Sequence, residues 1–221
     1  MSKSRPSLIL ERAARQVLAP LGLSQVGRSR SWRDDHRWYA IIVEFQPSDF
    51  SRGSYLNVGI NWLWSELDYE TFDVSGDRGI EYVEYESDAQ FEPEAERLAT
   101  FAAGQVTRYR ARFPTAAQAA RHYGVLGRGL TFWERYHAGV LRGLLGHRWR
   151  AGWHFRRFCA ETRGSDLDGE IEAGRRAARL RALTADPPAF RREIRGAIER
   201  TRALLRMPAV DGDPLPLDAG G

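Results

Sequence analysis

The stretch SYLNVGINWLW, Ser54 to Trp64, is the most regular phrase in this chain. Apolar residues occupy every second position: Leu56, Val58, Ile60 and Trp62. Successive side chains of a β-strand point to opposite faces of a sheet. The alternation therefore predicts a strand whose one face lies in a hydrophobic core.

The opposite face of this strand is polar and aromatic, and it carries Tyr55, Asn57 and Asn61. Gly59 stands between the two asparagines and leaves room for a neighbour to approach closely. Two interpretations stay open for this row of side chains. The neighbour is a covering helix at 93–113, or that helix covers the other face and the row is a binding surface.

Three further segments alternate in the same way and complete a sheet. Arg28–Arg33 predicts a first strand, Asp34-Asp35 its turn, and Arg37–Gln46 a second strand. Gly79–Glu86 predicts a fourth strand after the opening phrase. Because the connections are short, we expect an antiparallel meander of about four strands, since parallel neighbours need long crossovers.

Helical periodicity flanks this sheet on both sides. Ser7–Ala19 repeats apolar residues at helical spacing before Pro20, and Pro93–Phe113 does so before Pro114, with Pro93 in the first turn. Thr115 is expected to cap a short helix that ends at Gly124. Four more helices are predicted: Leu130–Leu145, His147–Thr162, Leu167–Leu183 and Pro188–Met207.

The predicted fold class is therefore α+β, with a sheet covered by helices and an arginine-rich helical C-terminal part. Residues 1–125 are expected to form the α+β domain and 126–208 a helical extension. Residues 209–221 are expected to be a flexible tail because they hold little apolar surface. A chain of 221 residues with 43% hydrophobic content is large enough for a core.

Nothing in the sequence predicts a membrane protein or an exported one. No apolar run approaches the roughly 20 residues that span a bilayer. The start, MSKSRPSLILERAAR, reaches Glu11 after three apolar residues and has no signal-peptide core. The single cysteine, Cys159, cannot form an internal disulfide. We therefore expect a cytoplasmic protein.

Charge is divided unevenly along the chain. Only Lys3 is lysine among the 33 basic residues, a bias typical of GC-rich bacterial genomes. Residues 1–113 hold 14 basic and 17 acidic groups, whereas 114–221 hold 19 and 12. Twelve carboxylates lie between Glu66 and Glu96, with Arg78 as the one basic residue. Such a segment repels nucleic acid or pairs with a basic surface, of which the C-terminal half is one candidate.

Common catalytic and metal-binding motifs are absent from the sequence. The glycines of Gly124–Gly129 lack the Lys-Ser/Thr of a phosphate-binding loop. Glu134 and His137 have the spacing of di-iron helices, but those bundles need the motif twice with two further glutamates. His147 and His154 lie two helical turns, or about 10 Å, apart and cannot share a metal directly. We therefore expect neither a metal nor a cofactor.

Two weaker chemical interpretations remain. Cys159 follows Arg156 and Arg157, so it is either a thiol of lowered pKa or a small core residue. Four residues near the predicted strands are the first suspects of an unrecognised enzyme: Asp34, Asp35, His36 and Glu44. A nuclease of the type that pairs such carboxylates with a strand lysine is disfavoured, because position 46 is Gln.

The segment HRWRAGWHFRRF, His147 to Phe158, mixes basic and aromatic side chains. It contains Arg148, Arg150, Arg156 and Arg157 beside Trp149, Trp153, Phe155 and Phe158. Arginine binds phosphate and aromatic rings stack on bases, so the pattern suits a nucleic-acid surface. Trp149, Trp153 and Arg156 also share one side of a helix, with Phe155 and Phe158 nearby, which suits a core-facing stripe edged by arginine.

Several short motifs resemble a bacterial family of domains of unknown function, number four-three-zero-four. The matching positions are Leu21-Gly22-Leu23, Arg30 with Trp32, Val43 to Gln46, and Asn57-Val58-Gly59. The resemblance covers residues 8–125, and it implies a small α+β domain with no established catalytic residues. It assigns no role to any position and does not extend to the arginine-rich helices.

Three functional hypotheses follow. The first is a non-enzymatic protein-interaction module, such as an immunity or defence-system component, that meets a protein partner through Tyr55, Asn57 and Asn61 or through the acidic segment. The second is a nucleic-acid-binding protein that uses the arginine-rich helices. The third is an enzyme with an unrecognised site. An exposed stripe of arginines would favour the second hypothesis, and arginines paired with the acidic segment would weaken it.

Overall fold

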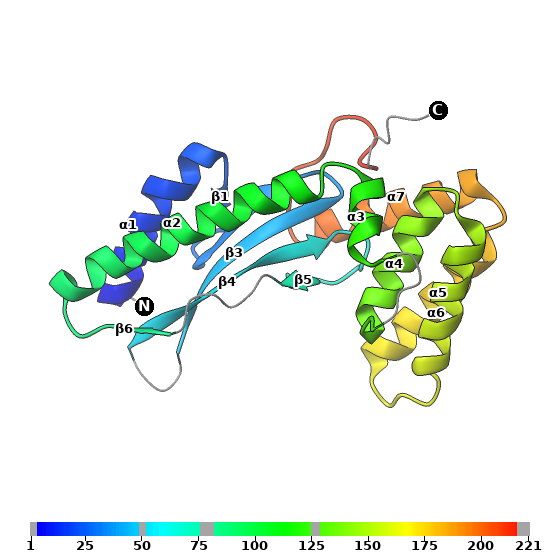
Figure 1. Cartoon of the computed structure of the whole chain (residues 1–221), viewed down its shortest axis with the longest axis horizontal. Helices are drawn as coiled ribbons and strands as arrows, with labels where there is room; N and C mark the ends of the chain where they lie inside the picture. The colour runs from blue at the N-terminus through cyan, green and yellow to red at the C-terminus, as the bar shows by residue number, and fades with distance from the viewer. Residues whose placement is uncertain (1–3, 49–51, 76–81, 125–128, 216–221) are drawn as a thin grey trace. The chain divides into compact units, whose positions relative to one another are not determined.

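The computed structural model describes residues 4–48, 52–75, 82–124 and 129–215 (Figure 1). The chain divides into two compact units, Met1–Asn61 with Glu70–Ala111, and Trp62–Tyr69 with Arg112–Gly221. The first unit holds the sheet and the second holds helices, which confirms the α+β fold class.

The strands of the first unit form one antiparallel sheet. They are β1 (Ser24–Gln25), β2 (Ser31–Asp35), β3 (Tyr39–Pro47), β4 (Gly53–Trp62), β5 (Val74–Ser75) and β6 (Val83–Glu84). The order is β1-β2-β3-β4-β5, and β6 also pairs with β4. The predicted core row of β4 is confirmed, since Leu56, Val58, Ile60 and Trp62 are all buried.

The turn predicted at Asp34-Asp35 is wrong, because both residues belong to β2. Asp34 pairs with Ile41 and Asp35 with Ala40 across the β2–β3 ladder. The chain reverses after them at Arg37, whose φ is +69°. Turn propensity is overridden at Asp34 because Arg110 donates a hydrogen bond to its carboxylate at 2.7 Å, a contact that local sequence cannot reveal.

The fourth strand is shorter than predicted. Within Gly79–Glu86 only Val83 and Glu84 form a strand, β6, and residues 79–81 lie outside the described part of the chain. The short strands β1 and β5 were not predicted. A strand of two residues is too short to show an alternation of apolar and polar side chains. These two strands are therefore recognised only by their pairing with β2 and β4 in the structure.

Three helical elements complete the first unit: α1 (Arg5–Leu18), the 3-10 turn η1 (Ala19–Leu21) and α2 (Asp88–Arg112). Helix α2 begins before the predicted Pro93, which lies inside it. Ser87 starts the helix, since its Oγ accepts from the backbone N of Gln90 at 3.3 Å. Near the other end, the Tyr109 hydroxyl donates to the backbone oxygen of Val74 at 3.4 Å, so α2 packs on the sheet (Figure 1).

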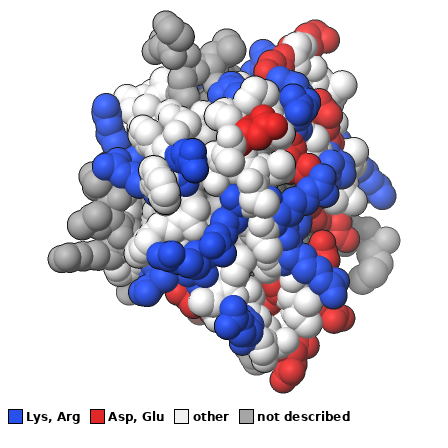
Figure 2. All heavy atoms as spheres, turned by 90° about the vertical axis from the view of Figure 1, so that its right-hand side faces the viewer, with Lys and Arg blue, Asp and Glu red and all other residues white. Residues whose placement is uncertain are grey.

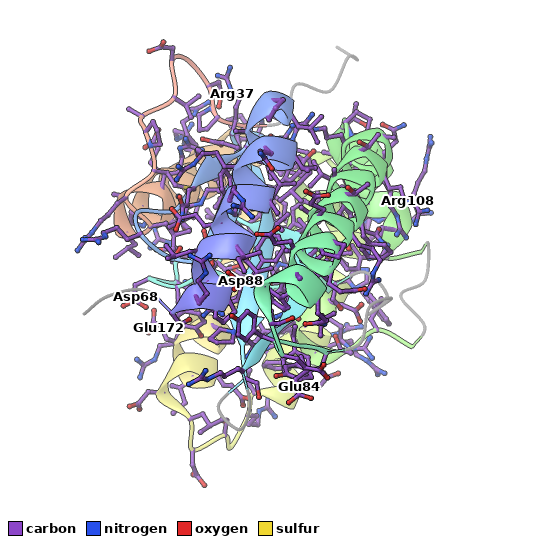
Figure 3. The ribbon with its side chains drawn as sticks, turned by 90° about the vertical axis from the view of Figure 1, so that its left-hand side faces the viewer. Arg37, Asp68, Glu84, Asp88, Arg108 and Glu172 are labelled. Carbon is purple, nitrogen blue, oxygen red and sulfur yellow. The ribbon has the colours of Figure 1, made fainter. Side chains whose placement is uncertain are left out.

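The acidic segment Glu66–Glu96 pairs mostly with arginines of the first unit. Arg5 donates to Asp88 at 2.6 Å, and Arg12 donates to Glu92 at 2.6 Å. These contacts join α1 to α2, which lie side by side in Figure 3 with Asp88 labelled. Arg33 binds Glu70 at 2.8 Å. The basic partners of this segment are thus largely N-terminal arginines, while Glu66 pairs with Arg200 and Arg176 of the C-terminal half.

The second unit contains five helices within the described residues. They are α3 (Ala116–His122), α4 (Phe132–Leu144), α5 (Arg148–Glu161), α6 (Asp168–Leu183) and α7 (Pro187–Leu204). All five were predicted to within a few residues. Thr115 caps α3 as expected, and Gly124 follows it with a φ of +67°. Helix α3 contacts α4, so the unit boundary falls at Arg112, whereas the sequence division placed α3 with the sheet.

The core of the second unit is built around the end of the opening phrase. The indole rings of Trp62 and Trp64 stack with centroids 5.1 Å apart. Trp62 Nε1 donates to the Tyr123 hydroxyl at 2.8 Å, and Trp64 Nε1 donates to His137 Nδ1 at 3.1 Å. Each buried indole N–H therefore has an acceptor, as a buried polar group requires.

Part of the segment predicted as a flexible tail is held against the second unit. Leu215 is 2% exposed. Arg195 on α7 donates to both carboxylate oxygens of Asp213, at 3.1 and 2.6 Å. Residues 209–215 are thus tied by one apolar anchor and one ion pair, which their low apolar content did not predict.

Candidate functional site: the arginine and tryptophan face of α5

Helix α5 packs against α4 through one well-defined face. Its buried residues are Ala151, His154, Phe155 and Phe158. A Cβ placed on Gly139 of α4 would lie 2.8 Å from the Phe155 ring, so the glycine makes room for that ring. Gly146, with a φ of +73°, reverses the chain between the two helices. This packing fixes which side of α5 faces solvent.

The tryptophans of α5 lie on the solvent side. Trp149 is 82% exposed, and Trp153 is half-buried. The core-facing stripe considered for this helix is therefore wrong for Trp149, whereas Phe155 and Phe158, expected beside it, do lie in the core. Arg148 lies over the Trp149 ring at 5.1 Å and Arg157 over the Trp153 ring at 5.5 Å. Cation–π contacts of this kind order an exposed indole.

The four arginines of α5 form a positively charged surface with this tryptophan. Arg148, Arg150, Arg156 and Arg157 are all exposed. None of them forms an ion pair with another described residue. Figure 2 shows the face of the molecule with the C-terminal helices, where basic side chains gather in oblique bands and acidic ones lie mostly toward the right-hand and lower edges.

Several arginines of α6 and α7 differ because carboxylates neutralise them. Arg175 pairs with Glu172 at 3.5 Å, and Arg179 pairs with Glu193 at 2.7 Å. The number of arginines in a helix does not show whether they are paired, as these are, or lack carboxylate partners, as those of α5 do. The discriminating feature is the carboxylate partner, and it favours α5 as the candidate surface for an anionic partner.

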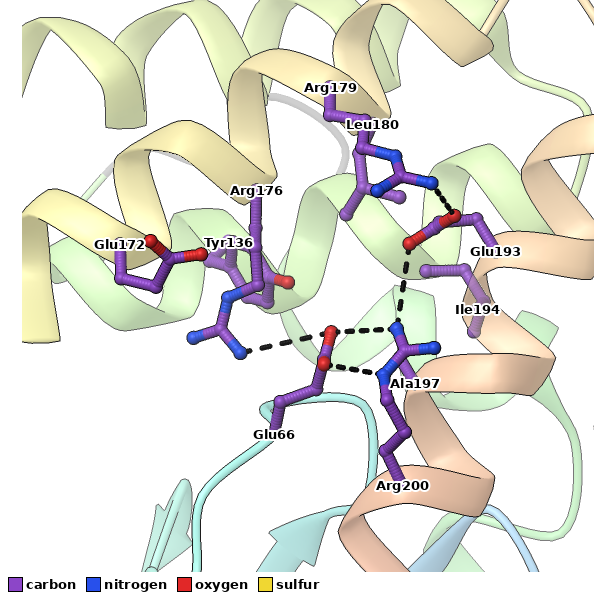
Figure 4. Close-up of a pocket in the computed structure, with 10 residues that line it drawn as sticks. All are labelled: Glu66, Tyr136, Glu172, Arg176, Arg179, Leu180, Glu193, Ile194, Ala197 and Arg200. Atoms are coloured by element: carbon purple, nitrogen blue, oxygen red, sulfur yellow. Dashed lines mark hydrogen bonds and ion pairs between the residues drawn. The ribbon is translucent and has the colours of Figure 1, made fainter.

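Arg176, Arg179 and Arg200, each with a carboxylate partner, line a cavity of about 270 Å³ that Figure 4 shows. Arg200 donates to both oxygens of Glu66, at 2.7 and 3.1 Å, and Arg176 lies 3.9 Å from the same carboxylate. Glu193 joins Arg179 to Arg200. Burial raises the pKa of Tyr136, beside this network, to about 12. Since its charges largely compensate one another, the cavity has no strong preference for an anion.

The geometry does not support metal binding by Glu134 with His137, or by His147 with His154. Glu134 closes a capping box at the start of α4, where its carboxylate accepts from the backbone N of Thr131 at 2.7 Å. His137 is buried and accepts from Trp64. Burial lowers the pKa of His154 to about 4, with Arg142 and Arg135 adding to the effect. No group of three possible metal ligands occurs among the described residues.

The enzyme suspects of the first unit are held by structural contacts. Asp34 is 7% exposed and bonds both His36 Nε2, at 2.8 Å, and Arg110. Burial alone would raise its pKa, but the hydrogen bonds from His36 and Arg110 lower it. Asp35 accepts from the backbone N of Arg37, and Glu44 accepts from Asn57 Nδ2 at 3.0 Å. Each carboxylate thus has a role in the fold.

Cys159 is a half-buried residue of α5, whereas one of its two interpretations placed it in the core. Its thiol lies 3.6 Å from the backbone oxygen of Gly174. Burial raises the pKa of the thiol, and Arg181 and Arg163 oppose the effect without reversing it. A lowered pKa from Arg156 and Arg157 is therefore not found.

The polar row of β4 is only partly accessible. Asn61 is 2% exposed and donates to Thr71 Oγ1 at 2.7 Å, so its proposal as a binding residue is corrected to a structural one. The space beside Gly59 is filled by Phe72, to which an added Cβ would approach within 2.9 Å. Tyr55 is 43% exposed and Asn57 is half-buried. A binding role for these two stays a prediction.

No family model, curated protein or solved structure matches the chain. The resemblance to family four-three-zero-four therefore stays a prediction. No helix in the described part of the chain is both long and apolar enough to cross a bilayer.

Proposed function

We propose that the protein binds single-stranded nucleic acid through the solvent face of α5. One observation carries the proposal: helix α5 carries four exposed arginines that pair with no carboxylate of the described residues, together with Trp149, which is 82% exposed. Phosphates would supply the missing negative charges, and an unpaired base would stack on the exposed Trp149 indole beside the guanidinium of Arg148.

The physical basis has two parts. Arginine forms forked, charge-assisted hydrogen bonds that match the geometry of phosphate. Stacking of an unpaired base on an aromatic side chain contributes about 1–3 kcal/mol and tolerates any base. A paired base offers its ring face to its own neighbours in the stack, so the exposed indole favours a single strand over a duplex.

Salt dependence of binding tests the proposal. We expect a fluorescently labelled single-stranded oligonucleotide to bind in an anisotropy titration, with log K falling linearly as log salt rises. Each neutralised phosphate contributes a slope of about −0.7 for a single strand, so four arginine contacts give a slope of about −3. Undetectable binding at low salt, or a slope near zero, would overturn the proposal.

A matched pair of double variants locates the surface. Arg156→Gln with Arg157→Gln removes two unpaired arginines of α5, and Arg175→Gln with Arg179→Gln removes two paired arginines of α6. We expect the first to reduce the magnitude of the salt slope by about 1.4, and the second to change it much less. Equal effects would mean that net charge alone drives binding, and the α5 surface would lose its role.

A protein partner is the second candidate, and the same tryptophan favours it. Tryptophan and arginine are the residues most enriched at the energetic centres of protein interfaces. Copurification of the tagged chain from its native host, with nuclease treatment, tests this candidate. A stoichiometric protein that is retained by the intact chain and lost with Trp149→Ala would support it, and would place the chain among interaction modules such as immunity or defence components.

A further inference from the structure

A small cavity in the first unit holds a second basic feature, independent of α5. Its volume is about 120 Å³. Helix α1, the β1–β2 turn and the adjoining strands enclose it. The lining residues that matter to its chemistry are Ser7, Gln25, Arg28, Ser29, Arg30 and Trp32.

Arg30 extends from the β1–β2 turn toward α1. Its backbone oxygen accepts from the backbone N of Phe45 at 3.1 Å, which anchors the residue to β3. Its Nη2 donates to Ser7 Oγ on α1, and Ser7 Oγ also shares a hydrogen bond of 2.7 Å with Ser4 Oγ. Its Nη1 is buried and has no hydrogen-bond partner among the described residues. One edge of the guanidinium group therefore lacks an acceptor.

The positive charge of Arg30 is also uncompensated. No carboxylate of the described residues pairs with it, whereas Arg33 nearby in sequence pairs with Glu70. Burial alone lowers the pKa of Arg30. Arg28 is exposed at the same cavity and likewise has no ion-pair partner within the described chain. Glu11 also lines the cavity, but Arg15 binds its carboxylate at 2.9 Å.

A buried N–H of a charged group that lacks an acceptor, as Arg30 Nη1 does, costs free energy that a ligand oxygen can recover. We propose that this cavity binds a phosphate group, held by the Arg30 guanidinium and the Ser7 hydroxyl, with Arg28 at its mouth. A forked guanidinium and a hydroxyl are both suited to a tetrahedral oxyanion.

The volume of this cavity suits a phosphate group but is too small for a drug-sized organic ligand. Pockets for drug-sized ligands are larger, about 300–1,000 Å³. Arg28 and Ser29 are exposed, so the cavity is reached from solvent and the phosphate can be free or attached to a larger molecule.

Phosphate-dependent stability tests the site on the full chain. We expect the unfolding temperature to rise with the logarithm of inorganic phosphate concentration, against chloride at matched ionic strength, because a ligand bound only by the folded state stabilises it. Arg30→Gln should abolish this rise while leaving the chain at least as stable without phosphate. Arg28→Gln, at an exposed position, should reduce it without altering the fold.

Two control variants separate this site from other basic surfaces. Arg108→Gln removes an exposed arginine of α2, labelled in Figure 3, that does not line the cavity. Arg156→Gln with Arg157→Gln removes the candidate nucleic-acid contacts. Both should keep the full phosphate response. An unchanged response in Arg30→Gln and Arg28→Gln, or no response in the wild type, overturns the proposal.

Two other ligands, acetate and glycerol phosphate, test which chemical group the cavity binds. Acetate should give at most a small rise at the same concentration, and a rise equal to that of phosphate overturns the assignment to a phosphate group. Glycerol phosphate that acts as strongly as inorganic phosphate supports a phosphate group carried by a larger ligand. A much weaker effect of glycerol phosphate supports free phosphate in the same site.

Discussion

The two faces of α5 both carry aromatic side chains but have opposite surroundings. Phe155 and Phe158 are fully buried against α4, whereas Trp149 is 82% exposed. Both faces carry aromatic rings, whereas all four arginines of the helix are exposed. Aromatic content therefore does not decide which face lies in the core. The difference arises because Gly139 leaves a space that accepts one ring at the α4–α5 contact, and Phe155 occupies it.

The largest expected effect belongs to the buried face. Phe155→Ala should lower the free energy of unfolding by about 3–5 kcal/mol, because it removes a ring and leaves a cavity at a tightly packed contact. Trp149→Ala should change it by less than about 0.5 kcal/mol. Urea unfolding followed by circular dichroism measures both. A loss for Trp149→Ala as large as that for Phe155→Ala would refute the assignment of the two faces.

His154, also on the buried face, gives the second expected effect. Burial holds its pKa at about 4, below the value of about 6.5 in an unfolded chain. Between these values the unfolded chain binds a proton that the folded chain excludes, so stability falls as the pH is lowered from 6.5 to 4. The loss is on the order of 3 kcal/mol.

Variants isolate this contribution from other titrating groups. His154→Leu should flatten the dependence of stability on pH between 6.5 and 4, whereas His147→Gln, at the exposed start of the same helix, should keep most of it. Urea unfolding at closely spaced pH values provides the measurement. Parallel curves for the wild type and His154→Leu would contradict the assigned cause.

On the solvent face the expected effect concerns binding and not stability. Trp149→Ala should weaken binding of a single-stranded oligonucleotide by about 1–3 kcal/mol, since one stacking contact is lost. Trp149→Phe should retain much of the affinity because it keeps an aromatic ring. Anisotropy titrations at constant salt measure both variants. An unchanged affinity in Trp149→Ala would remove the indole from the contact surface, while arginine-dependent binding would remain testable by its salt slope.

Local periodicity predicted most of the helices and the core row of β4, because both depend on the spacing of apolar residues. It did not predict how Asp34 is used. A pair of aspartates favours a turn, but Arg110, far along the chain, keeps Asp34 in β2. The burial of Asn61 was missed for the same reason, since its partner Thr71 lies beyond the strand.

The candidate site was predicted in part. The segment His147–Phe158 was recognised as basic and aromatic, but helical spacing alone placed Trp149 and Trp153 on one side without showing whether that side faces the core. The pairing of the arginines was also hidden. Arg200 and its partner Glu66 are separated by most of the chain, so no local pattern signals their contact.

The smallest expected effect concerns the paired arginines that contrast with α5. Glu66→Gln should lower the free energy of unfolding by about 1 kcal/mol, because Arg200 and Arg176 lose the carboxylate that they share. The loss is small because water still hydrates the exposed part of the network. Glu199→Gln, an exposed carboxylate on α7, is the matched control and should have a smaller effect. The difference between the two should shrink at high salt, which screens exposed charges. If the two variants were equally stable at low salt, Glu66 would not neutralise these arginines, and they would have to be counted with those of α5 as available to an anionic partner.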